Sequence, residues 1–444
     1  MPPIPRLKAY SGPALFSYGF RPFFLFGSLF AGLAIVLWLP AYFGEWTLPT
    51  AIAQRDWHVH EMIYGYAGAV IAGFLLTAIP NWTGHLPLQG KPLIALTGLW
   101  IAGRLATAFS LFTGPWVAAA IDLAFLAAVI GFVARELGHG SQKRNRKVIV
   151  VLAILWLGNL VFHVEAIGLG GADYGVRIGV AATLLLVMLI GGRIIPSFTR
   201  NWLARTNPGP LPAPLDRWDI AAILVAALAL AAWIVAPQSP FAGAALLIAG
   251  LAQAARLARW RGHRAWRDRL VLVLHVAYAF VPVGFVLTAL SAFGVVSVSA
   301  GEHAWGIGVF GGMTIAVMSR ASLGHTGRAL AASPAVQTIY ALIFGAAIAR
   351  VCAAVLPEWA WVGLHVSAFA WAAAFFGFAL AYWRACRPSP RRVNGGAASA
   401  AASPAVVIAV TVPSECNRPA SASSDRSPAA PRRERPLPAS GEGG

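Results

Sequence analysis

Long apolar stretches separated by short polar connections dominate the chain. Most of the stretches are about 20 residues long, which is the length an α-helix needs to cross a bilayer. Membrane β-strands are about half as long and alternate apolar with polar residues, so the pattern excludes a β-barrel. It predicts an all-α polytopic membrane bundle of about twelve helices. The expected helices cover 22–43, 62–80, 92–112, 115–134, 148–169, 174–194, 218–236, 241–258, 270–292, 303–321, 334–356 and 360–383.

Composition supports a membrane protein. The 444 residues are 58% hydrophobic and only 11% charged, whereas soluble domains carry about 25% charged residues. The formal net charge of +18 would suit a nucleic-acid-binding protein, but the basic residues concentrate in short connections such as 135–147 and 259–270. That distribution is typical of a membrane topology signal. It predicts that both termini are cytoplasmic and that the weakly charged loops 44–61 and 293–302 face outward.

The two ends of the chain differ from the apolar part. Residues 1–19 lack a compact apolar segment with a cleavage site, which predicts a retained cytoplasmic lead-in. The transmembrane domain is expected over 20–386, and the Ala/Pro/Ser/Arg-rich stretch 387–444 is expected to be a disordered cytoplasmic tail. The three cysteines are far apart and form no C-x-x-C-H motif. Any haem would therefore be bound non-covalently.

Five histidines are predicted at the outer ends of the helices. Ionisable groups inside a membrane are costly and mark functional sites, and imidazole suits haem iron, copper and zinc. The alternative is that each is an interior histidine bonded to a backbone carbonyl. These candidate metal ligands are His58, His60, His163, His303 and His365.

The segment WHVHEM, residues 57–62, is the most informative motif. On a helix, residues i and i+2 lie about 200° apart, so His58 and His60 are not expected to bind one metal together. Either the segment is not yet helical at this point, or the two histidines serve different partners. In the second case one would bind a metal, and the other would support it or serve a second centre. Glu61 is positioned to fix an imidazole tautomer, while Met62 shares a face with His58 and Tyr64 with His60.

Other polar residues are predicted deep inside the bundle. Asn159 and His163 share one helix face, with Glu165 nearby as a further supporting carboxylate. Arg104 is too deep to reach either interface, so we expect it to pair with a carboxylate, either Asp122 or a cofactor group.

Further arginines and histidines fall into two sets. Arg177 and Arg350 are candidates for binding the carboxylates of a cofactor. Arg193 and Arg320 are expected to extend to the cytoplasmic interface. Together with three histidines they form an expected cytoplasmic-side cluster of His85, Arg193, His275, Arg320 and His325.

Three helices end in similar sequences on the expected cytoplasmic side. They read GFLLTAIPNWTGH (73–85), GGRIIPSFTRNW (191–202) and GGMTIAVMSRASLGHTGR (311–328). Each combines small residues with a polar cluster. The similarity is consistent with a distant internal repeat or with convergent loop chemistry.

Taken together, these motifs with FRPFFL (20–25), LWIAGR (99–104) and NLVFHVEA (159–166) resemble the NnrS family over residues 14–385. The resemblance implies a bacterial twelve-helix inner-membrane protein that contains haem and copper and acts in the response to nitric oxide, often beside denitrification. The expected partners are the bilayer, nitric oxide and an electron donor, and no nucleic acid is expected. The positions that match the family's motifs are His58, His60, Glu61, Arg104, His163, Glu165, Arg193, His303 and His325.

These residues leave several functions open. The first is a protein that binds haem, most simply b-type, together with copper and handles nitric oxide, for which the expected cofactor-binding residues are His58, His60, His163, His303, Arg104, Arg177 and Arg350. The second is a catalytic nitric oxide reductase of the haem–copper type, which is disfavoured because no adjacent histidine pair occurs in the chain. A transporter for a metal or small anion and a sensor without chemistry are further alternatives.

Overall fold

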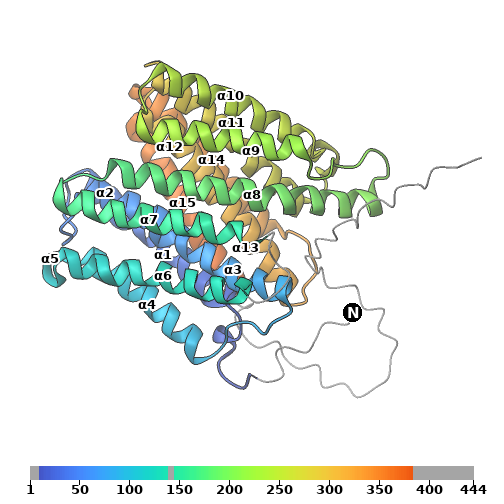
Figure 1. Ribbon diagram of the computed structural model, residues 1–444, viewed down its shortest axis with the longest axis horizontal. Helices are drawn as coiled ribbons and strands as arrows, with labels where there is room; N and C mark the ends of the chain where they lie inside the picture. The colour runs from blue at the N-terminus through green and yellow to red at the C-terminus, as the bar shows by residue number, and fades with distance from the viewer. Residues whose placement is uncertain (1–9, 139–144, 384–444) are drawn as a thin grey trace, which may run out of the picture. The chain divides into compact units, whose positions relative to one another are not determined.

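The computed structural model describes residues 10–138 and 145–383, which contain helices and no strands (Figure 1). The first part holds η1 (Ala14–Phe16), α1 (Phe20–Tyr42), α2 (Gln54–His60), η2 (Glu61–Ala67), α3 (Gly68–Thr83), α4 (Lys91–Ala108), α5 (Ser110–Thr113) and α6 (Pro115–Gly138). The middle holds α7 (Lys147–Gly168), α8 (Asp173–Thr206), α9 (Arg217–Val235), α10 (Pro240–Ala258) and η4 (Gly262–Ala265). The last part holds α11 (Arg269–Ala292), α12 (Val298–His303), η5 (Ala304–Gly311), α13 (Gly312–His325), α14 (Pro334–Val355), η6 (Pro357–Trp359) and α15 (Ala360–Tyr382).

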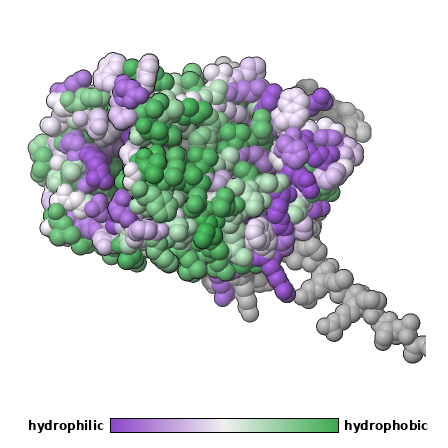
Figure 2. All heavy atoms as spheres, turned by 90° about the horizontal axis from the view of Figure 1, so that it is seen from above, coloured by the Kyte–Doolittle hydropathy of each residue, from purple (hydrophilic) through white to green (hydrophobic). Residues whose placement is uncertain are grey.

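The helices have the dimensions of membrane spans. Eleven helical stretches among the described residues are long and apolar enough to cross a bilayer. The remaining expected span is α4, an 18-residue helix that carries the charges of Lys91 and Arg104. Figure 2 shows a hydrophobic band across one face, with hydrophilic residues on either side of it. The protein is therefore an all-α, multi-pass membrane bundle; the expected tail 387–444 lies outside the described residues.

Three successive segments of the bundle repeat one packing scheme. Each contains four spans: α1 to α6 in the first segment, α7 to α10 in the second and α11 to α15 in the third. In each, the first span packs on the second (α1 on α3, α7 on α8, α11 on α13) and the third on the fourth (α4 on α6, α9 on α10, α14 on α15). The fourth span of each segment packs on the first of the next, and α15 closes the ring on α1. This scheme agrees with an internal repeat.

The second span of each segment lies at the centre. These inner spans are Gln54–Thr83, Asp173–Thr206 and Val298–His325, and each contacts the others. Their apolar windows are 83%, 67% and 67% buried, whereas those of α9 and α14 are only 33% buried. The three similar sequences ending in polar clusters lie on these inner spans.

Two inner spans contain a π-helical segment directly after a histidine. Segment η2 follows His60, and η5 follows His303. A π-helical turn is wider than an α-helical turn, is rare, and occurs frequently at functional sites. The two π-helical segments therefore indicate that the regions around His60 and His303 are candidate functional sites.

Candidate metal site and second histidine cluster

A network of polar side chains lies near the end of the bundle that carries the loops 43–53, 109–114 and 169–172, here called the low-charge end. We define the first network as His60, Glu61, Arg104, Asp122, Asn159 and His163. His60 ends α2, Asp122 is the eighth residue of α6, and His163 lies five residues before the end of α7. At 1.5 Å per residue, these positions lie about 7–11 Å from the helix ends. Four spans therefore bring their polar groups to one depth.

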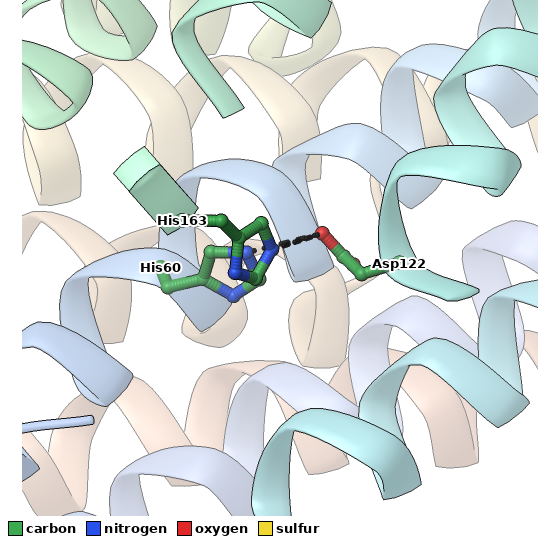
Figure 3. Close-up of side chains that lie close together, drawn as sticks. All are labelled: His60, Asp122 and His163. Atoms are coloured by element: carbon green, nitrogen blue, oxygen red, sulfur yellow. Dashed lines mark hydrogen bonds and ion pairs between the residues drawn. The ribbon is translucent and has the colours of Figure 1, made fainter. Parts of the chain in front are cut away.

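The two imidazoles of the first network face one carboxylate oxygen (Figure 3). His60 Nε2 lies 3.2 Å from Asp122 Oδ2, and His163 Nε2 lies 3.1 Å from the same atom. The two histidine rings are 4.8 Å apart between centroids. Asn159 donates a 2.7 Å hydrogen bond to Asp122 Oδ2. The side chains of His60, Asp122 and His163 are all buried.

Both ring nitrogens of His60 face oxygen atoms that accept hydrogen bonds. Nδ1 lies 3.1 Å from Glu61 Oε1, while Nε2 faces Asn159 Oδ1 at 3.0 Å as well as Asp122 Oδ2. A neutral imidazole carries one N–H and one lone pair. If Nδ1–H donates to Glu61, the Nε2 lone pair points at two acceptors. In this tautomer a metal ion at Nε2 would satisfy the lone pair and both acceptor oxygens.

Arg104 joins the two carboxylates of the network. It donates to Glu61 through Nη1 and to Asp122 through Nη2. Asp122 is the carboxylate partner that the sequence analysis expected for Arg104, and Glu61 is an additional partner. Thr107 also donates a 2.7 Å hydrogen bond to Glu61. One guanidinium between two carboxylates leaves one formal negative charge, which a metal cation would offset.

Gly65 makes room for this ion pair. A Cβ atom at Gly65 would lie 2.4 Å from Arg104 Nη1 and 2.6 Å from a Glu61 carboxylate oxygen. The Gly65 carbonyl meanwhile accepts a 2.9 Å hydrogen bond from Trp100. The glycine within η2 thus lets Arg104 reach both carboxylates.

The geometry fits a metal ion held by His60, Asp122 and His163. Among the described residues, these form a group whose three donor atoms all lie within 4.8 Å of one another. Ligands of one ion with bonds of about 2.0–2.2 Å would lie about 3–4 Å apart, so a small approach of the side chains completes the site. Glu61 would then orient the His60 ring from its other nitrogen, as carboxylates commonly do beside metal-bound imidazole. Two nitrogens and one oxygen suit copper, zinc or non-haem iron.

A second group of residues lies at the same end of the bundle. We define the third cluster as Trp38 and His58 of the first segment together with Ser299, His303 and Arg350 of the third segment. His58 stacks on Trp38 with ring centroids 4.0 Å apart, and its Nδ1 is buried without a hydrogen-bond partner among the described residues. His303 Nδ1 lies 2.8 Å from the Ser299 carbonyl, and Arg350 donates a 2.7 Å bond to the Ser299 hydroxyl.

The third cluster contains side chains of the types that bind a large aromatic cofactor. His58 and His303 are close enough for their charges to interact, and each also interacts with Arg350. His58, His303 and Arg350 all retain some accessible surface. The His58 Nδ1 atom has no hydrogen-bond partner within the described part of the chain, so it is available to a ligand. Two imidazoles, an aromatic wall and a guanidinium are the groups that a haem with its propionates would use.

The five outer histidines thus do not form one constellation. His60 and His163 belong to the first network, and His58 and His303 to the third cluster. His365 is partly exposed, stacks on Phe43, lies at a tilt to the Trp361 ring, and has Nδ1 2.8 Å from the Trp361 carbonyl. The separation of His58 from His60 follows from their places on opposite faces of α2.

Several expected supporting residues have other partners. Glu165 accepts backbone hydrogen bonds from Tyr174 and Gly175 at 3.2 and 2.7 Å, so it caps the start of α8. Arg177 donates to the Ile234 carbonyl and lies over the Tyr174 ring.

Tyr64 and Met62 lie close to the two histidines of α2 along the chain. The Tyr64 ring lies 5.4 Å from the His60 ring, and its hydroxyl donates to the Gly175 carbonyl at 2.7 Å. Met62 is half-buried against the apolar core.

The expected cytoplasmic-side residues bind separate partners. His85 pairs with Glu136 at 2.8 Å, and Arg193 donates to Asn145 at 3.2 Å. His275 bonds its own helix at Val271 and approaches Thr199, Arg320 lies 3.9 Å over the Phe198 ring, and His325 packs beside Tyr18. Each of the five residues thus contacts a different partner, and these contacts are spread over several spans.

One buried network elsewhere pairs its two charges within the protein, although Arg256 Nη2 has no hydrogen-bond partner among the described residues. We define the second network as Asp219, Gln253, Arg256 and Tyr278. Arg256 donates to Asp219 at 2.8 Å and to Tyr278 at 2.7 Å, and Tyr278 donates to Gln253 at 2.7 Å. This network contains no histidine and balances its charges by itself, so it joins α9, α10 and α11 structurally.

Sequence reasoning did not identify Asp122 as a candidate metal ligand. It was expected only as a partner of Arg104, yet it lies at the centre of the first network. A lone carboxylate in the apolar sequence AAAIDLAFL was the available signal.

Comparison with known proteins agrees with the motifs. No curated protein matches this chain. The sequence profile described as NnrS protein matches residues 14–388, which cover every span of the bundle. The chain belongs to the NnrS protein family.

Proposed function

We propose that this protein is a metalloprotein of the bacterial inner membrane that acts in the response to nitric oxide. In this proposal, His60, Asp122 and His163 hold one metal ion, copper by the family resemblance. His58 and His303 hold a non-covalent haem whose propionates Arg350 would bind. Haem iron would supply the binding of nitric oxide, and copper would supply redox or ligand-binding chemistry beside it.

One observation carries this proposal above the others. His60 is buried between Glu61 and Asp122, with acceptor oxygens facing both ring nitrogens. The arrangement stabilises a cation at Nε2 and already contains the carboxylate that orients a metal-bound ring. A satisfied interior histidine would instead show one donor and one acceptor partner.

The direct test uses the full chain purified in detergent. We expect a Soret band that shifts on addition of nitric oxide, together with about one equivalent of copper by elemental analysis. Asp122→Asn should lose the copper, because it weakens a charged ligand while keeping the shape of the side chain. His85→Ala, at an exposed ion pair, is the matched control and should keep both cofactors.

The alternatives give other results in the same experiment. Zinc or iron in place of copper would change the identity of the metal but not its ligands. Consumption of nitric oxide with a supplied electron donor would favour the reductase, and a colourless, metal-free preparation that moves a solute would favour the transporter. The colourless result would overturn the proposal.

A further inference from the structure

The three inner spans line an apolar cavity of about 80 Å³ that is partly open rather than enclosed. It is lined only by these spans, over residues 67–74, 183–194 and 310–317. Representative lining residues are Val70, Phe74, Leu186, Ile190, Phe310 and Val317. The cavity therefore lies where the three repeated segments meet.

The cavity offers water almost nothing to bind. Its two polar side chains, Thr183 and Thr314, donate their hydroxyls to the backbone carbonyls of Gly179 and Gly311 at 2.9 and 3.0 Å. Thr314 also bonds the Tyr66 hydroxyl. A buried water needs about three polar partners, and apolar cavities of about this size stay dry and bind xenon or small hydrocarbons. The space suits a small uncharged molecule.

A π-helical segment connects each of the two histidine groups to a residue that lines the cavity. Segment η2 begins directly after His60 and ends at Ala67, which lines the cavity. Segment η5 begins directly after His303, and its residue Phe310 lines the cavity from another side. About seven residues separate each histidine from the cavity, which corresponds to about 10 Å along a helix. Both π-helical segments therefore run from a histidine to this space.

We infer that this cavity binds a small, uncharged, apolar molecule of the size of a dissolved diatomic gas and supplies it to the two histidine sites. The destination of the molecule rests on the proposed function, but its binding in the cavity does not. A lipid acyl chain is the other apolar occupant that a partly open cavity could admit, and the xenon experiment distinguishes it from a small molecule.

Xenon is the probe for this site. Crystals of the full chain under xenon pressure should show a xenon peak between the three inner spans. Val317→Phe should abolish the peak by filling the cavity, whereas Val317→Ala should increase its occupancy. Val150→Phe makes the same change on the exposed face of α7 and should leave the peak unchanged.

A second readout tests the supply of ligand. Nitric oxide should bind the purified holoprotein more slowly in Val317→Phe than in wild type or Val150→Phe. Absence of xenon from the wild-type cavity, or an ordered acyl chain or water there, would overturn the inference. Equal nitric oxide rates in Val317→Phe and Val150→Phe would overturn the supply role alone. Xenon binding requires neither haem nor copper. The xenon experiment therefore tests the cavity even if the proposed function is wrong.

Discussion

The first network and the third cluster lie at the same end of the bundle, yet they differ in almost every physical property. The first is fully buried and rich in charge, and its side chains bond one another directly. The third is partly accessible and largely aromatic, and His58 has a ring nitrogen without a protein partner among the described residues. A closed set of charged donors suits a bare ion, whereas an open aromatic wall suits a large planar group.

The difference between the two sites arises from one short helix, α2, which directs two histidines to opposite sides. His58 and His60 are two residues apart on α2, so their side chains leave it on opposite faces. Trp38 of α1 receives one ring, and Asp122 of α6 receives the other. Helix α2 thus separates two neighbouring sites while holding both at one depth.

The largest effect should come from removing a buried charge of the first network. Arg104→Leu leaves two carboxylates together without their guanidinium, which should lower the free energy of unfolding in detergent by about 3–5 kcal/mol. Arg350→Leu is the matched change in the third cluster, and it removes the hydrogen bond to a serine hydroxyl. It should cost less, about 1.5–3 kcal/mol. Thermal unfolding of both variants measures the two losses of stability. Equal losses in the free energy of unfolding would show that the first network is no more charge-dependent than the third cluster.

A smaller effect is expected from Glu61→Gln. The amide keeps the shape of the side chain but loses the charge that orients the His60 ring and pairs with Arg104. Metal affinity should fall by about 10–100-fold while haem content stays unchanged. Titration with a competing chelator measures the affinity. Unchanged affinity would remove Glu61 from the metal site.

The corresponding change in the third cluster is Ser299→Ala. Its hydroxyl accepts a bond from Arg350 and lies 3.2 Å from His303 Nδ1, although the backbone carbonyl still holds that ring. Loss of one such bond costs about 1 kcal/mol, or about fivefold in haem affinity. Haem titration should detect this, with the metal content unaffected. If Ser299→Ala lost the metal instead, the first network and the third cluster would not be independent sites.

The smallest effect is expected at a surface pair remote from both sites. The hydrogen bond from Arg259 holds the pKa of the Asp216 carboxyl below its usual range, so the pair stabilises the fold above about pH 4 and that stability is lost as pH falls through the lowered pKa. Asp216→Asn keeps the helix cap and should cost less than about 1 kcal/mol at pH 7. The difference from wild type should shrink in acid. Loss of a cofactor in this variant would be unexpected.

The sequence was sufficient to predict an all-α, multi-pass bundle, because the length and apolar character that a bilayer requires act on each span separately. The π-helical segments were not predictable, since Gly65 and the residues around it read as an ordinary apolar helix. The threefold packing scheme was visible only as three similar helix ends, because contacts such as α15 on α1 join residues at opposite ends of the chain.

The site was predictable in its residue types but not in its partners. Helix geometry correctly separated His58 from His60, and depth correctly required a carboxylate for Arg104. Neither argument could place Asp122 between two histidines, because the rotation of α6 relative to α7 depends on tertiary packing. Glu165 looked like a site residue, yet it caps α8 after a tight turn.

The most direct test of the two-site account compares His58→Ala with His60→Ala. Haem and metal are quantified in both variants, purified in parallel with wild type. We predict that His60→Ala loses the metal and keeps haem, whereas His58→Ala loses haem and keeps the metal. If both substitutions remove the same cofactor, or neither removes any, the division of α2 between two centres is contradicted.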